Sequence, residues 1–242
     1  QVLARRPNDG FANLVMAVQA IKKGDYKAAE QQIGRMGPEN LLGPLRDYTL
    51  AWLKAGDKDF AGARALLARL KPAGGERAEA PAFVIATQID ELAGDKAAAE
   101  TKYRRAIELD KNSLRTTIAV AEGLRRLGKT DDADAILKTY GEKYSDTVVV
   151  DGLVGPNAPM PKPPSPAAGI ADLLFNIGGS LASDQRAPNS DVALIFYQMA
   201  ASLQPEHDFA WLMISGLYEQ FQLVPKAVAA LAKIGPSSPL HW

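Results

Sequence analysis

Alanine recurs along this chain at a nearly constant spacing, and this repetition constrains the fold more than any other feature. The successive spacings are 34, 36, 34, 60 and 34 residues for Ala29, Ala63, Ala99, Ala133, Ala193 and Ala227. A fixed period of this length is typical of repeat proteins, whose units stack because no single unit can bury its apolar face alone. The chain is therefore expected to be an array of short, similar units.

A turn with a shared composition precedes four of these alanines. The four turns are Gly24-Asp25-Tyr26, Asp57-Lys58-Asp59-Phe60, Gly94-Asp95-Lys96 and Gly128-Lys129-Thr130. Glycine adopts a positive φ without steric cost, so it commonly ends a helix. We expect one helix to end at each turn and the next helix to begin about three residues later.

The segments beside the turns have the period of an α-helix. Tyr26, Ala29, Ile33 and Met36 fall at i, i+3, i+7 and i+10, which places them on one helical face. Alternation typical of a strand is nowhere sustained, apart from the short apolar run at 148–150. The sequence therefore predicts an all-α fold.

Several residues beside the alanines match one known repeat. They are Pro205, Trp211, Ile214, Ser215, Tyr218, Ala227 and Leu231 in the last repeat, Gly94, Ala99, Tyr103 and Ala106 in the third, and Ala17, Gly24, Tyr26 and Ala29 in the first. With these residues the chain resembles the tetratricopeptide repeat (TPR) family. The resemblance implies a right-handed superhelical α-solenoid of about six helix pairs with a concave groove.

The chain is also similar to the multi-repeat proteins of Gram-negative bacteria that often carry a signal peptide. This second resemblance implies the periplasm or the cell envelope. The absence of cysteine leaves the redox compartment open, so the cytoplasm fits the sequence as well. The first residues, Gln1 to Pro7, lack the basic start, apolar core and cleavage pattern of a signal peptide, and the alternative is that the chain begins mid-protein, with a targeting signal cut away.

A proline-rich segment interrupts the array between the fourth and fifth repeats. Its prolines are Pro156, Pro159, Pro161, Pro163, Pro164 and Pro166. Proline cannot continue a helix or a central strand, so we expect an extended linker or strap with polyproline II character. The expected division is repeats one to four at 1–145, with 1–8 the end of a preceding helix, the proline-rich segment at 146–168, and repeats five and six with the start of a further helix at 169–242.

Composition excludes several classes of function. Lys plus Arg and Asp plus Glu both total 28, so no overall charge draws the chain to nucleic acid. The absence of cysteine excludes disulfide scaffolds, thiolate nucleophiles and Cys-ligated zinc. No uncharged apolar run is long enough to span a membrane. These counts leave the oligomeric state open.

Groups that could perform catalysis are scarce. His207 and His241 are the only histidines, and we expect a structural or solvent-facing role for both. No phosphate-binding glycine loop, nucleophile elbow or His-Glu-x-x-His motif is present. Asp90 stands where the TPR pattern has a large packing residue, and we expect it to pair with a neighbouring Lys or Arg, with a role in binding as the alternative. The sequence therefore predicts a non-enzymatic protein with no cofactor or metal.

The resemblance to the TPR family also implies which residues face the groove. In that family the first helix of each pair lines the concave side. The corresponding residues are Leu14, Val18, Tyr48, Trp52, Gln88, Glu91, Glu122, Arg125, Phe175 and Leu212. Aromatic side chains such as Tyr48 and Trp52 are of the type that anchors partner segments. The alternative is that both belong to the core between repeats, because a shift of one helical position would bury them.

The leading interpretation is a protein–protein interaction scaffold that binds a partner peptide or helix in the groove. The lysine, asparagine and arginine ring by which family members clamp a terminal carboxylate is absent. Two alternatives remain: the regulatory or substrate-presenting part of a larger enzyme, and a binder of a small apolar ligand or lipid. We further expect Leu153 to Pro164 to cover part of the concave face, with Tyr48, Trp52 or Phe175 receiving the prolines. The alternative is a purely structural strap.

Overall fold

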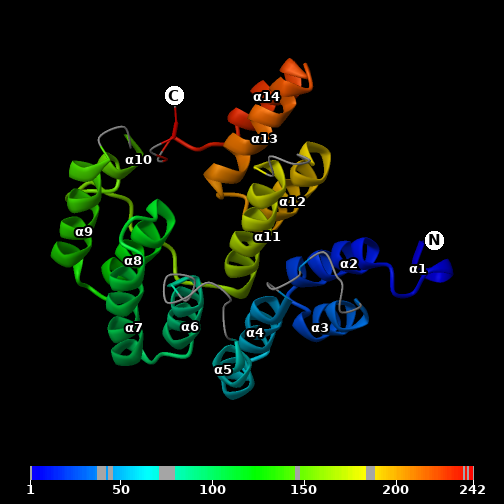
Figure 1. The fold of residues 1–242 in the computed structure, drawn as a ribbon, viewed down its shortest axis with the longest axis horizontal. Helices are drawn as coiled ribbons and strands as arrows, with labels where there is room; N and C mark the ends of the chain where they lie inside the picture. Colours follow the sequence, from blue (N-terminus) through cyan, green and yellow to red (C-terminus); the bar gives the residue numbers. More distant parts are fainter. Residues whose placement is uncertain are drawn as a thin grey trace. The chain divides into compact units, whose positions relative to one another are not determined.

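The computed structural model describes residues 2–36, 42, 46–70, 80–144, 148–183, 189–236, 238, 240 and 241, with the backbone alone described at 81, 82, 148 and 149. Every regular element among these residues is an α-helix (Figure 1). The expected all-α fold is therefore confirmed.

The helices fall into two compact units, which we describe one at a time. Unit 1 comprises residues 1–59 and 165–236, and unit 2 comprises residues 60–164 and 237–242. The helices of unit 1 are α1 (Val2–Arg5), α2 (Gly10–Lys22), α3 (Tyr26–Arg35), α4 (Arg46–Gly56), α11 (Pro166–Ala182), α12 (Ser190–Leu203), α13 (Asp208–Gln220) and α14 (Val224–Leu231). Those of unit 2 are α5 (Phe60–Arg69), α6 (Ala80–Leu92), α7 (Lys96–Leu109), α8 (Leu114–Arg126), α9 (Thr130–Lys143) and α10 (Val148–Asp151).

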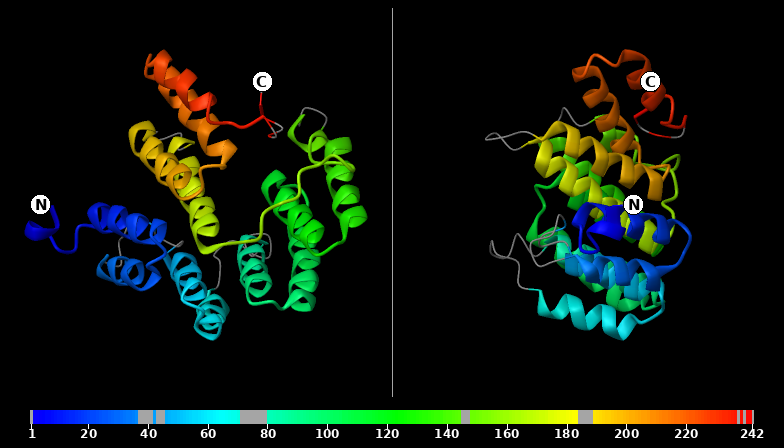
Figure 2. Two further views of the ribbon diagram at one scale, coloured as in Figure 1. Left: turned by 180° about the vertical axis from the view of Figure 1, so that it is seen from behind. Right: turned by 90° about the vertical axis from the view of Figure 1, so that its right-hand side faces the viewer.

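Helices that are neighbours in sequence pack in pairs within each unit. The pairs are α2 with α3, α11 with α12, and α13 with α14 in unit 1, and α6 with α7 and α8 with α9 in unit 2. The two further views in Figure 2 show the same pairing. The stacked helix pairs expected from the 34-residue spacing are thus present, and the helices of the second repeat, α4 and α5, belong to different units.

The repeated alanines lie in the cores of these pairs, as expected. Ala29, Ala63, Ala99, Ala133 and Ala193 are fully buried, and Ala227 is 7% exposed. A side chain of this size lets two helix backbones approach closely, so that larger neighbours fill the flanking space.

The turns before the alanines share one backbone conformation. A residue with positive φ lies five positions before the alanine at Gly24, Lys58, Gly94, Gly128 and Gln222. The expected role of the glycines is confirmed, and a lysine and a glutamine adopt the same conformation in two repeats. Asp25 and Asp95 follow two of the glycines, and their carboxylates accept hydrogen bonds from the backbone N–H of Ala28 and Ala98. These contacts cap the next helix.

Unit 1 joins two segments that are far apart in sequence. Helix α11 packs against α4, and α12 packs against α2. At the first contact Gly169 lies against Trp52: a Cβ atom on this glycine would lie 2.1 Å from Trp52 Cε2. The compact units therefore differ from the sequential blocks 1–145 and 169–242, because this close approach joins the second repeat to the fifth.

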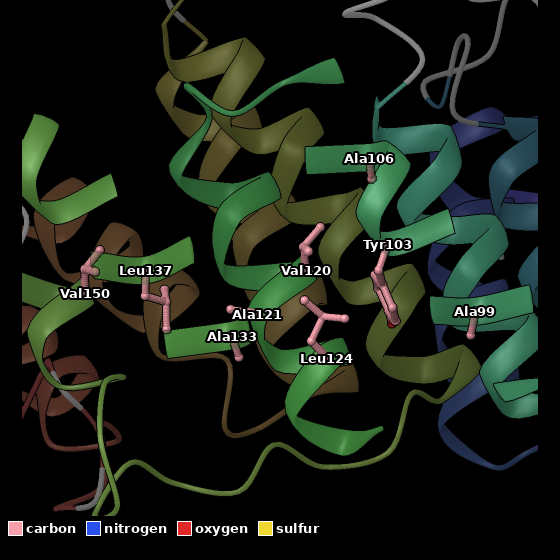
Figure 3. Close-up of a cluster of buried hydrophobic side chains, with 9 residues drawn as sticks. All are labelled: Ala99, Tyr103, Ala106, Val120, Ala121, Leu124, Ala133, Leu137 and Val150. Carbon is pink, nitrogen blue, oxygen red and sulfur yellow. The ribbon is translucent and has the colours of Figure 1, made fainter. Parts of the chain in front are cut away.

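The core of unit 2 connects four consecutive helices, α7 to α10. Figure 3 shows Tyr103, Val120 and Leu124 beside one another, with Leu137 near Val150. The Tyr103 ring packs on Gly123 of the next repeat, where a Cβ atom would lie 2.1 Å from Tyr103 Cζ. Leu153 and Val154 pack against this cluster from the segment that follows α10.

Two expected boundaries are wrong. Helix α11 begins at Pro166, inside the proline-rich segment, because a proline is tolerated in the first turn of a helix and the Ser165 hydroxyl accepts the Ala168 N–H at 3.2 Å. Helix α10 lies inside that segment as well. Near the end of the sequence we expected the start of a further helix, but Ser238, Leu240 and His241 lie in no helix.

The part of the proline-rich segment between α10 and α11 is residues 152–164. We call these residues the strap.

Candidate functional site

One face of α8 carries a stripe of mixed apolar and charged side chains. Ile118, Ala121, Glu122 and Arg125 fall at i, i+3, i+4 and i+7, so they share one side of the helix. The helix begins after Ser113, whose hydroxyl accepts the Thr116 N–H at 3.2 Å. We call these four residues the α8 face.

The strap lies on the α8 face. Leu153, Pro159 and Pro161 line a cavity of about 160 Å³ together with the four residues of the α8 face and Leu137 of α9. Figure 2 shows the strap as an extended trace between α10 and α11. Both Glu122 and Arg125, which were expected in a groove, are thus beside an extended proline-containing segment.

Asp134 of α9 connects the α8 face to the strap. Its Oδ1 atom accepts a hydrogen bond from Arg125 Nη2, and its Oδ2 atom accepts the Gly155 N–H at 3.0 Å. The Arg125 side chain is 6% exposed and that of Asp134 is 16% exposed. Gly155 has a φ of 90°, a conformation that favours glycine. The ion pair therefore fixes the start of the strap at a residue that can adopt the turn.

Four of the predicted groove residues lie in the core of unit 1. The exposed fractions of Leu14, Val18, Tyr48 and Trp52 are 2%, 6%, 8% and 0%. The expectation that they face an open groove is wrong, and the alternative that Tyr48 and Trp52 are core residues describes this structure. The physical reason is the packing of two distant helices on the first two repeats. Helices α11 and α12 pack on α2, and α11 also packs on α4, where it places Gly169 over the Trp52 indole.

Glu91 lies in a half-buried network with Arg126 and Tyr103. Arg126 Nε donates to Glu91 Oε1 at 2.7 Å, and the Tyr103 hydroxyl donates to Glu91 Oε2 at 3.0 Å. Burial raises the pKa of Tyr103 far above its ordinary value, so its hydroxyl stays a donor. Glu91 therefore joins two repeats instead of facing a partner, and the nearby Gln88 is half-buried.

Phe175 and Leu212, the last two predicted groove residues, are half-buried in unit 1. The Phe175 ring lies 5.3 Å from the Tyr197 ring and 4.9 Å from the His207 ring. Of the predicted set, Glu122 and Arg125 line one cavity together.

Asp90 is buried and pairs with basic side chains, as expected. Arg64 Nε donates to its Oδ1 atom at 2.7 Å, and Lys102 Nζ donates to Oδ2. Two cations therefore compensate one buried carboxylate, as burial of a charge requires.

The histidines have the expected kinds of role. His207 is 7% exposed and caps α13, since its Nδ1 atom accepts the Ala210 N–H at 3.2 Å. His241 is exposed.

Within the described ranges, no group of three or more His, Cys, Asp or Glu side chains is arranged to hold a metal ion. No helix among the described residues is long and apolar enough to cross a membrane.

Sequence reasoning missed Asp134 as a site residue. A signal was available, because the position after the repeated alanine is charged in four repeats, at Glu30, Arg64, Glu100 and Asp134. In each case this residue forms an ion pair with a neighbouring helix or turn. A periodic charge beside a buried alanine thus marks contacts between helices.

Comparisons with known proteins add a limited structural likeness. No family model matches the chain, and no curated protein matches it. Two crystal structures of MamA are similar: one has 18% identity and a TM-score of 0.31 over 74% of this chain and 89% of that one. The other has 14% identity and a TM-score of 0.25 over 93% of this chain and 88% of that one. The helical-repeat fold therefore rests on the helix pairs of the chain itself.

Proposed function

We propose that this chain is a non-enzymatic interaction scaffold of the TPR type, and that its α8 face binds an extended, proline-containing segment of a protein partner. The observation that carries the proposal is the cavity shared by the α8 face with Leu153, Pro159 and Pro161 of the strap. The strap is an example, within the chain, of the kind of segment that this face accepts.

The chemistry of the α8 face suits such a segment. Ile118, Ala121 and Leu137 offer apolar surface to proline rings and aliphatic side chains, and the charged Glu122 and Arg125 stand beside them. A polyproline segment is already extended and loses little conformational entropy when it docks. The assignment to the TPR type is supported by the left-handed residue five positions before a buried alanine in five repeats.

The strap would compete with a partner for this face. A segment tethered by a short linker has an effective concentration of the order of millimolar, so a free peptide at micromolar concentration is largely excluded. A partner must therefore bind more tightly than the strap, or the strap must first be displaced.

A peptide with the sequence of residues 152–164 tests the proposal. It is labelled with a fluorophore and titrated by anisotropy into the intact chain and into a full-length variant with Leu153→Ser, Pro159→Ser and Pro161→Ser. We expect the peptide to bind the variant at least about tenfold more tightly than the intact chain, because the tethered competitor is weakened.

Two controls locate the binding. Adding Ile118→Glu to the strap variant should abolish peptide binding, since it places a charge in the apolar wall. In the peptide, Met160→Ser should have no effect, because Met160 is 70% exposed in the strap. Two outcomes would show that the strap is purely structural. One is that a scrambled peptide binds equally well, and the other is that the peptide does not bind a strap variant whose circular dichroism spectrum is unchanged.

The cavity under the strap favours a second candidate, a small apolar ligand. Pockets for drug-sized ligands usually measure about 300–1,000 Å³, whereas an engineered apolar cavity of about 150 Å³ holds benzene. The cavity here, at about 160 Å³, has room for one small ring. A lipid chain exceeds that volume, so the lipid form of this alternative is disfavoured.

A further inference from the structure

The cavity between the strap and the α8 face has a buried hydrogen-bond donor in its wall. Arg125 lines this cavity, and its side chain is 6% exposed. Its Nη2 atom donates to Asp134, whereas its Nε atom is buried and pairs with no acceptor among the described residues. A buried N–H group without an acceptor destabilises the state that contains it. The strap therefore covers the α8 face without satisfying the hydrogen bonds of Arg125.

An acidic side chain lies one turn of helix away from this donor. Glu122 lines the same cavity and precedes Arg125 by three residues, so both lie on one side of α8. A carboxylate accepts several hydrogen bonds, so Glu122 can accept one from a bound group in addition to its present contacts. The cavity thus combines a donor and an acceptor with the apolar surface of Ile118, Ala121 and Leu137.

A contact elsewhere in unit 2 shows which side chain joins such a pair. The Tyr103 hydroxyl donates to Glu91 Oε2 at 3.0 Å and accepts from Arg126 Nη2 at 3.0 Å. The Tyr103 ring packs on Gly123 of α8 and is fully buried. A phenol ring therefore fills a space beside α8 while its hydroxyl connects an arginine to a glutamate.

Other chemical groups fit the cavity less well. A carboxylate would lie near Glu122, and Asp134 already compensates the charge of Arg125, so like charges disfavour it. A purely apolar ring would leave the Arg125 Nε atom without an acceptor. A phenol hydroxyl both accepts and donates a hydrogen bond. The volume suits one ring, since the cavity measures about 160 Å³ and a cavity of about 150 Å³ holds benzene.

We propose that the partner segment that displaces the strap carries a tyrosine, whose ring fills this cavity and whose hydroxyl pairs with Arg125 and Glu122. This inference rests on the function proposed above, because it names the side chain by which a partner segment binds more tightly than the strap. The strap lines the cavity with Leu153, Pro159 and Pro161, and none of these side chains can form a hydrogen bond.

Two matched peptides test the inference. Both have the sequence of residues 152–164, with Pro161→Tyr in one and Pro161→Phe in the other, because Pro161 is half-buried and lines the cavity. Each is titrated by fluorescence anisotropy into the full-length strap variant with Leu153→Ser, Pro159→Ser and Pro161→Ser. We expect the tyrosine peptide to bind at least about tenfold more tightly, since a site built to pair with a hydroxyl rejects the analogue that lacks it.

Two controls assign the preference to Arg125. Adding Arg125→Lys to the strap variant keeps a cation opposite Asp134 but removes the Nε donor, so the preference for tyrosine should fall below about threefold. The affinity of the phenylalanine peptide should stay unchanged. Peptides with Met160→Tyr and Met160→Phe should bind equally well, because Met160 is 70% exposed in the strap.

Phenol and benzene test the cavity without any substitution in the chain, and they decide if the Arg125→Lys variant fails to fold. Titrated into the isotope-labelled intact chain and followed by the NMR signals of Ile118 and Leu153, phenol should bind more tightly than benzene. Benzene binding as tightly as phenol would overturn the inference. Equal affinities of the tyrosine and phenylalanine peptides would also overturn it, but would leave the proposed function standing. If none of the peptides binds, the unmodified one included, both are overturned.

Discussion

Two glycines set how closely neighbouring helices approach. Gly123 accommodates the Tyr103 ring in unit 2, and Gly169 accommodates the Trp52 indole in unit 1. In both places a methyl group would lie 2.1 Å from a ring carbon, far inside van der Waals contact. Because the rings are fully buried, neither can move aside without disturbing its own packing.

Replacing Gly169 should therefore destabilise unit 1. We expect Gly169→Ala to lower the free energy of unfolding by about 1–3 kcal/mol, the range typical of overpacking in a core. Chemical denaturation of the full chain measures the change. Gly179→Ala on the same helix is the control, since the nearest atom to its added Cβ would be Tyr197 Oη at 3.9 Å. This control should be neutral or stabilising by up to about 1 kcal/mol, because alanine favours the helix; equal losses in both variants would contradict the role of Trp52.

The helices of unit 2 are joined by ion pairs as well as by apolar packing. Arg125 and Asp134 link α8 to α9, and the same Asp134 holds the strap through the Gly155 N–H. Breaking a buried pair is costly because it leaves an uncompensated charge, whereas an exposed pair contributes little. The burial of each pair therefore predicts its importance.

Asp134→Ala tests this difference. We expect a loss of about 3 kcal/mol, because Arg125 would stay buried without its carboxylate partner. Asp132→Ala on the same helix is the matched control: Asp132 pairs with Arg104, both side chains are 46% exposed, and the loss should be below about 1 kcal/mol. Thermal and urea unfolding measure both variants, and a loss below about 1 kcal/mol for Asp134→Ala would show that Arg125 finds solvent or another partner.

The chain as a whole consists of two units, and the strap belongs to the second. Its Leu153 packs on the core of that unit, and Pro159 and Pro161 line the cavity. A docked segment is protected from proteases, whereas a loose one is cut early.

Limited proteolysis shows whether the strap is docked in solution. With proteinase K and mass spectrometry, we expect the first cuts in the intact chain to lie outside 152–164. In Leu153→Asp, which retains all the prolines, cuts within 152–164 should come first, because a buried charge undocks the strap. Early cleavage of the strap in the intact chain would remove the basis of the function proposed for the α8 face.

The sequence by itself determined the local structure of this protein. The spacing of the alanines predicted the helix pairs, and the glycines before them predicted the turns. Both predictions depend on helix period and φ preference, which act within a few residues. Asp90 was expected to pair with a cation for a similar reason, since a charge at a packing position must be compensated wherever it lies.

Only the tertiary structure decided which faces are open. The period of the apolar residues predicts that one side of a helix is buried. It does not predict whether a helix distant in the sequence also covers a second side. Trp52 was expected in the groove, and it is buried because α11 approaches through Gly169, more than a hundred residues away in the sequence. Arg125 was expected to be open, and the strap and Asp134 cover it. Contacts between segments this far apart depend on the complementary shapes of two surfaces, which no local pattern in the sequence contains.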